Sequence, residues 1–462
     1  MHQRIVIVGA GFCGSILAAS LLRRPPSAPT EIVLIERGTA IGRGLAYAAN
    51  DVPYVLNVPA GRLSADSRDP LQFLRFARQL HPQADAEDFM SRALYGDYLQ
   101  DVLDRAEQAA PSHMRLVRMF GEVTSIACGE GRPLRANFAD RESIGAHRVV
   151  LALGNPPPPV QSWAQAVRHH PAYIHDPWHM PRAFGAEHSV LIVGNGLTMV
   201  DVALALSMQG ETVPLVRTIS RHGLIPQAQT IFRPAAVQGN GEILWSNAAS
   251  MRRLLAVSRA LARDAEHLGG DWREVVTFIR HWVPNLWQRL PESERRRFLR
   301  HVQCYWDVHR HRLPPSMGAR IEQMRRSGKL KVHAGRIRQL IPEGHELRVA
   351  WRSRGSSRAD SFAVDAVINA TGPDYALKRL KDPLFRSLRA EGWICEDRLD
   401  LGLRTAQYGA CVSAAGVPSE HMFYLGPMLR ADHWEATAVT ELRTHAERLA
   451  QHLAGRSDPT HQ

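Results

Sequence analysis

The feature that most constrains what this chain can fold into is a glycine pattern that directly follows a hydrophobic strand. Residues 4–8 (RIVIV) form a β-branched run, residues 9–14 (GAGFCG) place glycines at the first, third and sixth positions, and an Ala/Leu-rich helical segment runs from there to about residue 24. A strand, a G-x-G-x-x-G turn and a helix in this order are typical of a dinucleotide-binding unit. A signal peptide is not expected here, because three glycines interrupt the apolar stretch.

Each residue of this turn has a physical role in such a unit. Gly9 permits the tight turn, Gly11 lets a pyrophosphate approach the backbone, and Gly14 lets the helix pack closely on the strand. The helix begins at about Phe12 and Cys13, and the unpaired amides at its N-terminus would face the phosphates. The turn therefore predicts a bound dinucleotide rather than a turn without a ligand.

An acidic residue follows where the ribose of that dinucleotide would lie. The next β-branched strand, residues 31–35, ends in Glu36. A carboxylate at this point accepts hydrogen bonds from the ribose hydroxyls and would repel a phosphate on the 2′ oxygen. Strand, glycine turn, helix, strand and acid together are a much more specific signal than the glycines alone.

The same pattern recurs in the middle of the chain. Residues 189–193 (SVLIV) form another β-branched strand, and a glycine turn and an apolar helix follow it. Met199 stands where the third glycine would be, so the helix is expected to sit farther from its strand. The residues predicted to hold a second dinucleotide are Gly194, Gly196, Leu197 and Thr198.

Cations replace the acid after this second turn. Residues 212–216 are predicted to be the strand, Arg217 follows it directly, and Arg221 lies four residues further on. A guanidinium group binds a phosphate bidentately, so the two arginines favour NADPH, with NADH as the alternative. Surface solubility is the other interpretation of these arginines.

Two dinucleotide units in one chain imply two coenzymes, and the usual pairing is FAD with a nicotinamide. Between the units, residues 116–126, 134–139 and 147–153 are predicted to form a three-stranded meander. Its last strand ends at Gly154, and four prolines follow soon after, which neither a helix nor a strand continues. This exit is interpreted as a crossing of the chain between two domains.

A second crossing is predicted near the end of the chain. Residues 364–370 read as a strand that ends in Thr371 and Gly372. The predicted fold class is α/β, with two Rossmann-like domains, the nicotinamide domain being inserted in a discontinuous FAD domain. The predicted boundaries are 1–180 plus 338–462 for the FAD domain and 181–337 for the NAD(P) domain, which includes a helical insertion at about 244–320.

Charge and cysteine content narrow the class further. The chain has 57 Lys and Arg against 45 Asp and Glu, a net charge of +12, and most of the surplus lies in residues 251–330. A solvated face of Arg-rich helices is the plain interpretation, and a lid or recognition element for a small, anionic substrate is the functional one. Five scattered cysteines without a C-x-x-C pair favour a reducing, cytoplasmic compartment. Neither metal, nucleic acid nor membrane is expected as a partner.

Two further segments are candidates to contact the flavin. An amide at Asn57, next to Val58, would hydrogen-bond a flavin carbonyl or a flavin-bound oxygen, which makes Asn57 the candidate catalytic residue; the alternative is an Asn that caps a turn before proline. Gly426, Pro427 and Trp434 precede an Ala-rich helix, whose N-terminus would stabilise negative charge on a reduced flavin. The alternative for this second segment is packing of the C-terminal core.

Over residues 4–450 the chain resembles a group of bacterial FAD/NAD(P)-binding proteins. The motifs above carry this resemblance together with residues 42–47 (GRGLAY), 56–60 (LNVPA), 92–96 (RALYG), 194–201 (GNGLTMVD), 220–226 (SRHGLIP) and 306–312 (WDVHRHR). The resemblance implies that Tyr47 also lies at the FAD. More distantly, the layout is similar to the class B flavin monooxygenases, notably the N-hydroxylating amino-acid monooxygenases, in which an NADPH domain is inserted in an FAD domain.

This resemblance implies an FAD-dependent monooxygenase. NADPH would reduce FAD, the reduced flavin would react with dioxygen, and a C4a-hydroperoxide would oxygenate a small amine or amino acid. The alternatives are a flavin oxidoreductase that passes electrons on without oxygenation, and a non-catalytic nucleotide sensor. Thiol chemistry is not expected, because the first helix carries Cys13 alone where related disulfide reductases carry a pair. An oligomer is left open.

Overall fold

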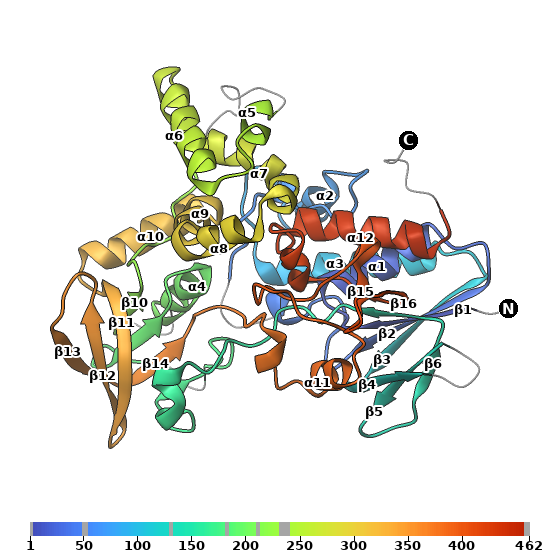
Figure 1. Cartoon of the computed structure of the whole chain (residues 1–462), viewed down its shortest axis with the longest axis horizontal. Coiled ribbons are helices and arrows are strands. Elements are labelled where there is room, and N and C mark those ends of the chain that lie inside the picture. The colour runs from blue at the N-terminus through green and yellow to red at the C-terminus, as the bar shows by residue number, and fades with distance from the viewer. Residues whose placement is uncertain are drawn as a thin grey trace. The chain divides into compact units, whose positions relative to one another are not determined.

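The computed structural model describes residues 3–48, 54–128, 133–180, 184–208, 213–230 and 241–456. Contacts within the chain divide it into two compact units, Met1–Pro156 with Tyr375–Gln462, and Pro157–Asp374. The two pieces of the first unit therefore carry the two ends of the colour scale in Figure 1, and the second unit carries its middle. The predicted α/β fold, in which one discontinuous domain encloses another, is confirmed.

A six-stranded sheet forms the centre of the first unit, in the order β15-β16-β7-β1-β2-β3. Every neighbouring pair is parallel except β15 with β16. Strands of a parallel sheet are covered on both faces, which is why the β-branched run of β1 is fully buried. The strands are β1 (Gln3–Val8), β2 (Thr30–Glu36), β3 (Met114–Phe120), β7 (Arg148–Leu151), β15 (Ala410–Val412) and β16 (Pro418–Tyr424).

Helix α1 is the central helix of the first unit. It packs against β1 and β2 and against two further helices, α3 and α12, and all of its residues before Arg23 are buried. This burial accounts for its Ala/Leu-rich sequence, which has no charge before the last turn. The longer helices of the unit are α1 (Phe12–Arg23), α2 (Gln72–Leu80), α3 (Arg92–Gln108), α11 (Pro383–Ala390) and α12 (Val439–Leu453), and short 3-10 turns are Leu45–Tyr47, Ala60–Arg62, Leu377–Arg379, Gln407–Gly409 and Pro427–Ala431.

The predicted meander exists, but its strands are not the predicted ones. A separate antiparallel sheet has the order β4-β5-β6, from β4 (Val123–Cys128), β5 (Leu134–Phe138) and β6 (Ile144–Ala146). The first predicted strand is broken at Gly121, whose N–H donates to the Glu36 carbonyl, so that its first half becomes β3 of the parallel sheet. The last predicted strand returns to the parallel sheet as β7, beside β1.

A seven-stranded sheet organises the second unit, in the order β13-β12-β11-β10-β9-β14-β8. The strands from β11 to β8 are parallel, and β12 and β13 extend the sheet as antiparallel hairpins. The strands are β8 (Tyr173–Ile174), β9 (Ser189–Val193), β10 (Leu215–Ser220), β11 (Leu330–Glu343), β12 (Glu346–Ser353), β13 (Ala359–Val364) and β14 (Ala366–Asn369); a 3-10 turn, Ser162–Val167, precedes them.

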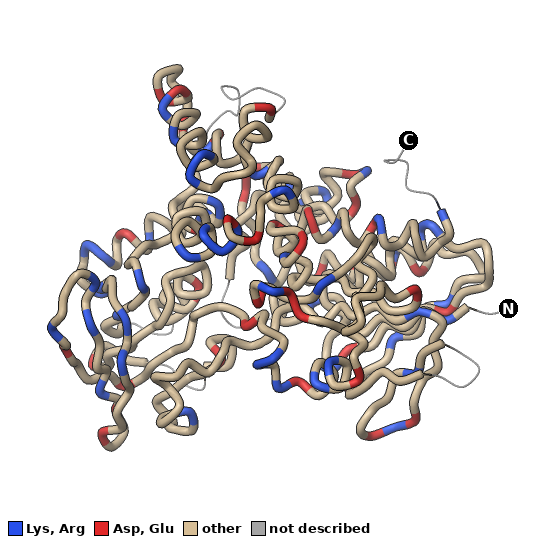
Figure 2. Tube along the Cα trace, in the orientation of Figure 1, with Lys and Arg blue, Asp and Glu red and all other residues tan. Residues whose placement is uncertain are grey.

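The predicted helical insertion is confirmed between β10 and β11. Its helices are α5 (Glu242–Trp245), α6 (Met251–His267), α7 (Trp272–Arg289), α8 (Glu292–His301), α9 (Gln303–Arg310) and α10 (Pro315–Arg326), whereas α4 (Leu197–Leu206) follows β9 directly. Lys and Arg recur along these helices (Figure 2). Among the described residues, no helix is both long and apolar enough to cross a membrane.

The unit boundaries differ from the predicted 180 and 338. The chain crosses after Pro156 and after Asp374, directly beyond the two strand exits at Gly154 and Gly372, so the two predicted crossings are found. Residues 157–180 instead supply β8 to the second sheet, and residues 338–374 supply its hairpins and β14. The prediction placed these segments in the wrong unit because it extended the first domain past its own crossing points.

Candidate dinucleotide sites

The first glycine turn is shaped by two close backbone approaches, and with Glu36 we call it the first cradle. Gly9 has a φ of +101°, and a Cβ there would overlap the carbonyl oxygen of Ala152. A Cβ at Gly14 would overlap the carbonyl oxygen of Gly9. Only glycine fits at either place, so α1 begins close against the turn, as a dinucleotide-binding loop requires.

The N-terminus of α1 is open to an anion. Gly11 caps the helix with extended backbone, and no side chain accepts from the first amides, which belong to Phe12 and Cys13. Uncapped amides at a helix N-terminus bind phosphate. Gly44 lies across the turn, since its Cβ would come within 3.0 Å of the Gly11 Cα, and the Gly42 N–H donates to the Ala10 carbonyl over 2.8 Å.

This second glycine pair, Gly42 and Gly44, was not among the predicted site residues. Both have positive φ, 93° and 54°, in a G-x-G spacing that the sequence shows. Side-chain-free backbone on two sides gives the first cradle room for a pyrophosphate.

Glu36 is the last residue of β2, and its carboxylate is hydrogen-bonded to the glycine turn and to the backbone after β2. Its carboxylate accepts from the N–H of Ala10 over 2.9 Å and from the N–H of Gly38 over 2.8 Å. An ionised carboxylate has about four acceptor sites, so the two amides leave acceptors for ribose hydroxyls. The structure thus places Glu36 beside the glycine turn, where the sequence predicts it.

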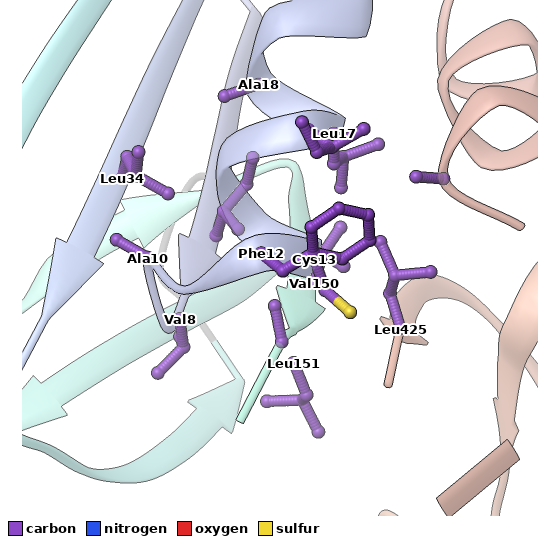
Figure 3. Packing of buried hydrophobic residues seen from close by; sticks show 14 of the residues in the cluster. Val8, Ala10, Phe12, Cys13, Leu17, Ala18, Leu34, Val150, Leu151 and Leu425 are labelled. Atoms are coloured by element: carbon purple, nitrogen blue, oxygen red, sulfur yellow. The ribbon is translucent and has the colours of Figure 1, made fainter. Parts of the chain in front are cut away.

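In the first unit Cys13 is buried, and Tyr47 is partly buried and packs against the same core. Figure 3 shows the Cys13 sulfur among apolar side chains that include Val150, Leu151 and Leu425. Burial raises the pKa of the Cys13 thiol to about 12, so it stays protonated and unreactive. Burial likewise raises the pKa of Tyr47 to about 12, and its ring lies 4.8 Å from that of Tyr95.

Asn57 and Val58 lie half-buried in the loop before the turn Ala60–Arg62. The loop is held by the Leu56 N–H, which donates to the Met90 carbonyl over 2.8 Å. The Val58 side chain packs on the core, whereas the Asn57 amide makes no hydrogen bond to another described residue. No turn-capping bond is therefore found for Asn57, and its predicted catalytic role stays a prediction.

The exits of β7 and β16 lie next to each other, because these strands are parallel neighbours. Gly154 follows β7 with a φ of +68° and open space where a Cβ would be. Gly426 follows β16, and a Cβ there would come within 2.8 Å of the Tyr424 hydroxyl. Pro427 then begins a short 3-10 helix that leads to Trp434, which is buried. The structure thus gathers these predicted residues at one edge of the first sheet.

The second glycine turn repeats the first, and with Ser220 and Arg221 we call it the second cradle. Gly194 has a φ of +105°, and a Cβ there would overlap the carbonyl oxygen of Ala370, as Gly9 would overlap that of Ala152. Gly196 caps α4 without a side-chain bond, and a Cβ there meets no atom within 4 Å. Open space beside Gly196 is where a pyrophosphate would approach.

Two further features of this cradle fit a ligand. Asn195 is 6% exposed, and both polar atoms of its amide are buried without a partner among the described residues. Buried polar atoms are nearly always paired, so an orphaned amide in a glycine turn indicates a missing partner. Thr371 and Gly372 leave β14 beside this turn, with the Thr371 hydroxyl donating to Asn369 Oδ1 over 2.8 Å and Gly372 at a φ of +86°.

The position of Arg217 differs from the prediction. The strand was expected to end at residue 216, but β10 continues to Ser220, so Arg217 lies inside the sheet, paired with Leu191 and Lys331. Its guanidinium lies 4.8 Å from the ring of Phe362. An arginine in mid-strand is not at the carboxyl edge where a ribose is held.

The strand register shows which residues stand where Glu36 stands in the first cradle. Ile35 pairs with Val8 before the first turn, and Ile219 pairs with Val193 before the second. Ser220 therefore corresponds to Glu36, and Arg221 is the first residue beyond the strand. Of the two predicted arginines, only Arg221 occupies the place from which a 2′-phosphate would be held.

More cations surround this place than the sequence suggested. Burial, followed by the nearby guanidinium groups of Arg354, Arg221 and Arg336, lowers the pKa of His222. The Arg354 N–H donates over 2.9 Å to the carbonyl of Ala334, the register partner of Ser220. Arg336 and Arg354 come from β11 and the end of β12, and no local motif marks them in the sequence.

The fold and the two cradles define a two-dinucleotide flavoprotein architecture. Residues 6–156 match the FAD-NAD(P)-binding family model. No curated protein sequence matches the chain.

Several solved structures have the same fold over almost the whole chain. The chain is similar to L-lysine 6-monooxygenase from Pseudomonas syringae, with a TM-score of 0.67 and 16% identity over 99% of this chain and 100% of that one. For the ornithine hydroxylase PvdA from Pseudomonas aeruginosa the TM-score is 0.64 at 15% identity, covering 98% and 99%. For the cadaverine monooxygenase DfoA from Erwinia amylovora it is 0.63 at 13% identity, covering 98% and 94%.

Proposed function

We propose that the protein is an FAD-dependent NAD(P)H oxidoreductase with a preference for NADPH, and that it oxygenates a small amine or amino acid. The observation that carries the proposal is the pair of equivalent glycine turns. The carboxylate of Glu36 accepts from the first turn, and Ser220 and Arg221 stand at the corresponding strand end beside the second. One chain thereby offers a place for an unphosphorylated ribose and a place for a phosphorylated one.

The residues of the first cradle fit FAD. Gly9 and Gly14 would admit the backbone approach, the amides of Phe12 and Cys13 would face the pyrophosphate, and Glu36 would accept from the adenosine ribose. FAD supplies the redox chemistry when bound, since it accepts a hydride from a nicotinamide and its reduced form reacts with dioxygen. The protein contributes binding, orientation and electrostatics to that chemistry.

The residues of the second cradle fit NADPH. Asn195 and the start of α4 would bind the pyrophosphate, and Gly372 leaves the backbone beside it uncovered. Arg221 would hold the 2′-phosphate, and the positive charge of Arg336 and Arg354 adds to its attraction. NADH lacks that phosphate and would bind more weakly.

The oxygenation step is supported by the similar structures, whose names are those of ornithine, lysine and cadaverine oxygenases. Dioxygen and a small amine-bearing molecule are accordingly the proposed co-substrates. Asn57 is the proposed polar group at the flavin, because its amide is half-buried and makes no hydrogen bond within the described residues.

The visible spectrum of the purified protein tests the proposal in two stages. We expect a flavin spectrum that NADPH bleaches under anaerobic conditions, and NADPH-dependent hydroxylation of at least one member of an amine and amino-acid panel in air. Bleaching followed only by oxygen consumption would favour a flavin oxidoreductase without oxygenation. Bound FAD that NADPH does not reduce would favour a nucleotide sensor, and a colourless protein that cannot be reconstituted would refute the proposal.

A further inference from the structure

In the first sheet, β2 lies on one side of β1, and β7 and β16 lie on the other. Glu36 ends β2, and the glycine turn that takes the pyrophosphate ends β1. The flavin half must then extend away from β2, and the sheet order places β7 and β16 on that side. Side chains at the exits of these two strands are therefore the ones nearest the flavin.

A cation, Arg430, lies just beyond the exit of β16. Arg430 belongs to the 3-10 helix that follows β16, and its guanidinium carbon lies 4.2 Å from the centre of the Trp434 ring and 5.1 Å from that of Tyr375. The Tyr375 hydroxyl donates to Asn155 Oδ1 over 2.8 Å, and Asn155 follows Gly154 at the exit of β7. The guanidinium is thus held by two aromatic rings.

The charge of Arg430 has no acidic partner in the described part of the chain. Its Nε is buried and donates to no described residue. Other arginines of the unit are paired, for example Arg23 with Asp66 at 3.3 Å. Arg430 as a whole is half-buried, so its charge is partly withdrawn from water without a counterion, which is unfavourable. A positively charged group fixed in this way fits an anion that comes from outside the polypeptide.

Tyr375 does not supply that anion. Burial raises the pKa of its hydroxyl, and the positive charge of Arg430 opposes this only in part, so Tyr375 remains a neutral donor to Asn155. The charge of Arg430 therefore stays available at the edge where the flavin half lies.

We propose that Arg430 stabilises the negative charge that the N1–C2=O edge of FAD carries when the flavin is reduced. This inference rests on the proposed function, because it requires FAD in the first cradle. A positive charge beside that edge favours the reduced flavin and thereby hydride transfer to FAD. The site is built by side chains from three separate segments, at Asn155, Tyr375 and Arg430 with Trp434.

Sulfite reports on this charge without turnover. Sulfite would add through its sulfur lone pair to N5 of oxidised flavin. The N5–S bond forms, the N5=C4a π bond breaks, and its electron pair shifts so that the added negative charge comes to lie on N1–C2=O. We expect Arg430→Gln to weaken sulfite binding to the FAD-loaded protein about tenfold, the effect of losing roughly 1.4 kcal/mol of charge stabilisation. The midpoint potential of FAD should fall in the same variant.

Two variants serve as controls. Arg430→Lys keeps the charge and should bind sulfite much more tightly than Arg430→Gln. Arg105→Gln removes one positive charge from an exposed pair with Asp101 on α3 and should leave sulfite binding unchanged.

Equal sulfite affinity in wild type and Arg430→Gln would overturn the inference, and so would an Arg430→Lys variant as weak as Arg430→Gln. An unchanged sulfite affinity with a raised KM for a carboxylate-bearing substrate would assign Arg430 to the substrate instead. If Arg430→Gln retains no FAD, the sulfite affinity of Arg430→Lys is compared with that of wild type. A similar affinity supports the inference, and a much weaker affinity contradicts it. Wild-type protein that binds no FAD would refute the proposed function itself, which is a separate result.

Discussion

In each unit a glycine with positive φ lies against the carbonyl that follows the last strand before the chain crosses to the other unit. Gly9 lies against Ala152, which follows β7, and Gly194 lies against Ala370, which follows β14. Each is followed by a helix whose first amides no side chain caps. The two cradles differ at the neighbouring strand end, where the first has Glu36 and the second has Ser220. We therefore expect the shared backbone to bind dinucleotides, and the residues at and just beyond this strand end to determine which dinucleotide fits.

The two cradles also differ at the third residue of the helix that follows each glycine turn. Gly14 brings α1 against the Gly9 carbonyl, whereas Met199 occupies the corresponding place in α4 and is fully buried. Because Met199 has a Cβ where Gly14 has none, we expect α4 to lie farther from its strand than α1 does, and this stays a prediction. The first cradle is therefore sterically tight, and the second has open space at Gly196.

The largest effect, on both stability and FAD binding, should come from adding a side chain at Gly14 in the first cradle. A methyl group at Gly14 would overlap the Gly9 carbonyl, so Gly14→Ala should displace α1, lower the free energy of unfolding by about 1–3 kcal/mol and abolish FAD binding. Thermal unfolding and flavin content measure both effects. Gly11→Ala is the matched control, since its methyl group meets Gly44 at an ordinary 3.5 Å. Gly11→Ala should lose FAD affinity but keep its stability. An unchanged FAD content in Gly14→Ala would contradict the close approach of α1 to the turn as a requirement for FAD binding.

A smaller effect, confined to NADPH binding, is expected from adding a side chain at Gly196 in the second cradle. Gly196 has a φ of −79°, which alanine adopts without strain, so Gly196→Ala should keep or raise the free energy of unfolding, by about 0.4–1 kcal/mol. Its methyl group would occupy the space through which the pyrophosphate of NADPH approaches. Calorimetry should show weakened NADPH binding with full FAD content. Loss of FAD in this variant would show that the two cradles are not independent.

The smallest effect concerns the choice between NADPH and NADH. Arg221→Ala should weaken NADPH binding by roughly 1.5–3 kcal/mol, the range for a hydrogen bond to a charged group, and leave NADH binding nearly unchanged. Arg217→Ala is the matched control, because Arg217 lies in mid-strand on Phe362 and should leave the preference intact. Equal losses for both coenzymes in Arg221→Ala would contradict the assignment of the 2′-phosphate.

The glycine turn of the first cradle and its acid could be predicted because their signals are local, whereas Gly42 and Gly44 were missed. Gly9, Gly11, Gly14 and Glu36 all lie on one strand–turn–helix–strand unit, and each is required by backbone geometry or by a ribose. The helical insertion and the interrupted first domain were also predicted correctly.

The errors arose where position depends on a strand partner. Arg217 reads as the end of a strand because it is charged, but pairing with β9 and β11 extends β10 to Ser220. The guanidinium of Arg217 lies over the ring of Phe362 in β13. Only the register of neighbouring strands reveals that Ser220 corresponds to Glu36.

Arg430 was missed for a related reason. Its aromatic partners are Tyr375 and Trp434, and Asn155, which accepts from Tyr375, comes from the other piece of the first unit. Such a site becomes visible only after the chain has folded both pieces of the first unit together.

Calorimetric titration of the FAD-loaded protein with NADP+ and with NAD+, with the flavin absorbance followed throughout, tests most directly whether one chain holds two different coenzymes at once. We predict one NADP+ bound per chain, more tightly than NAD+, with FAD retained at saturation. Displacement of FAD by NADP+, or the same affinity for NADP+ and NAD+, would contradict the account.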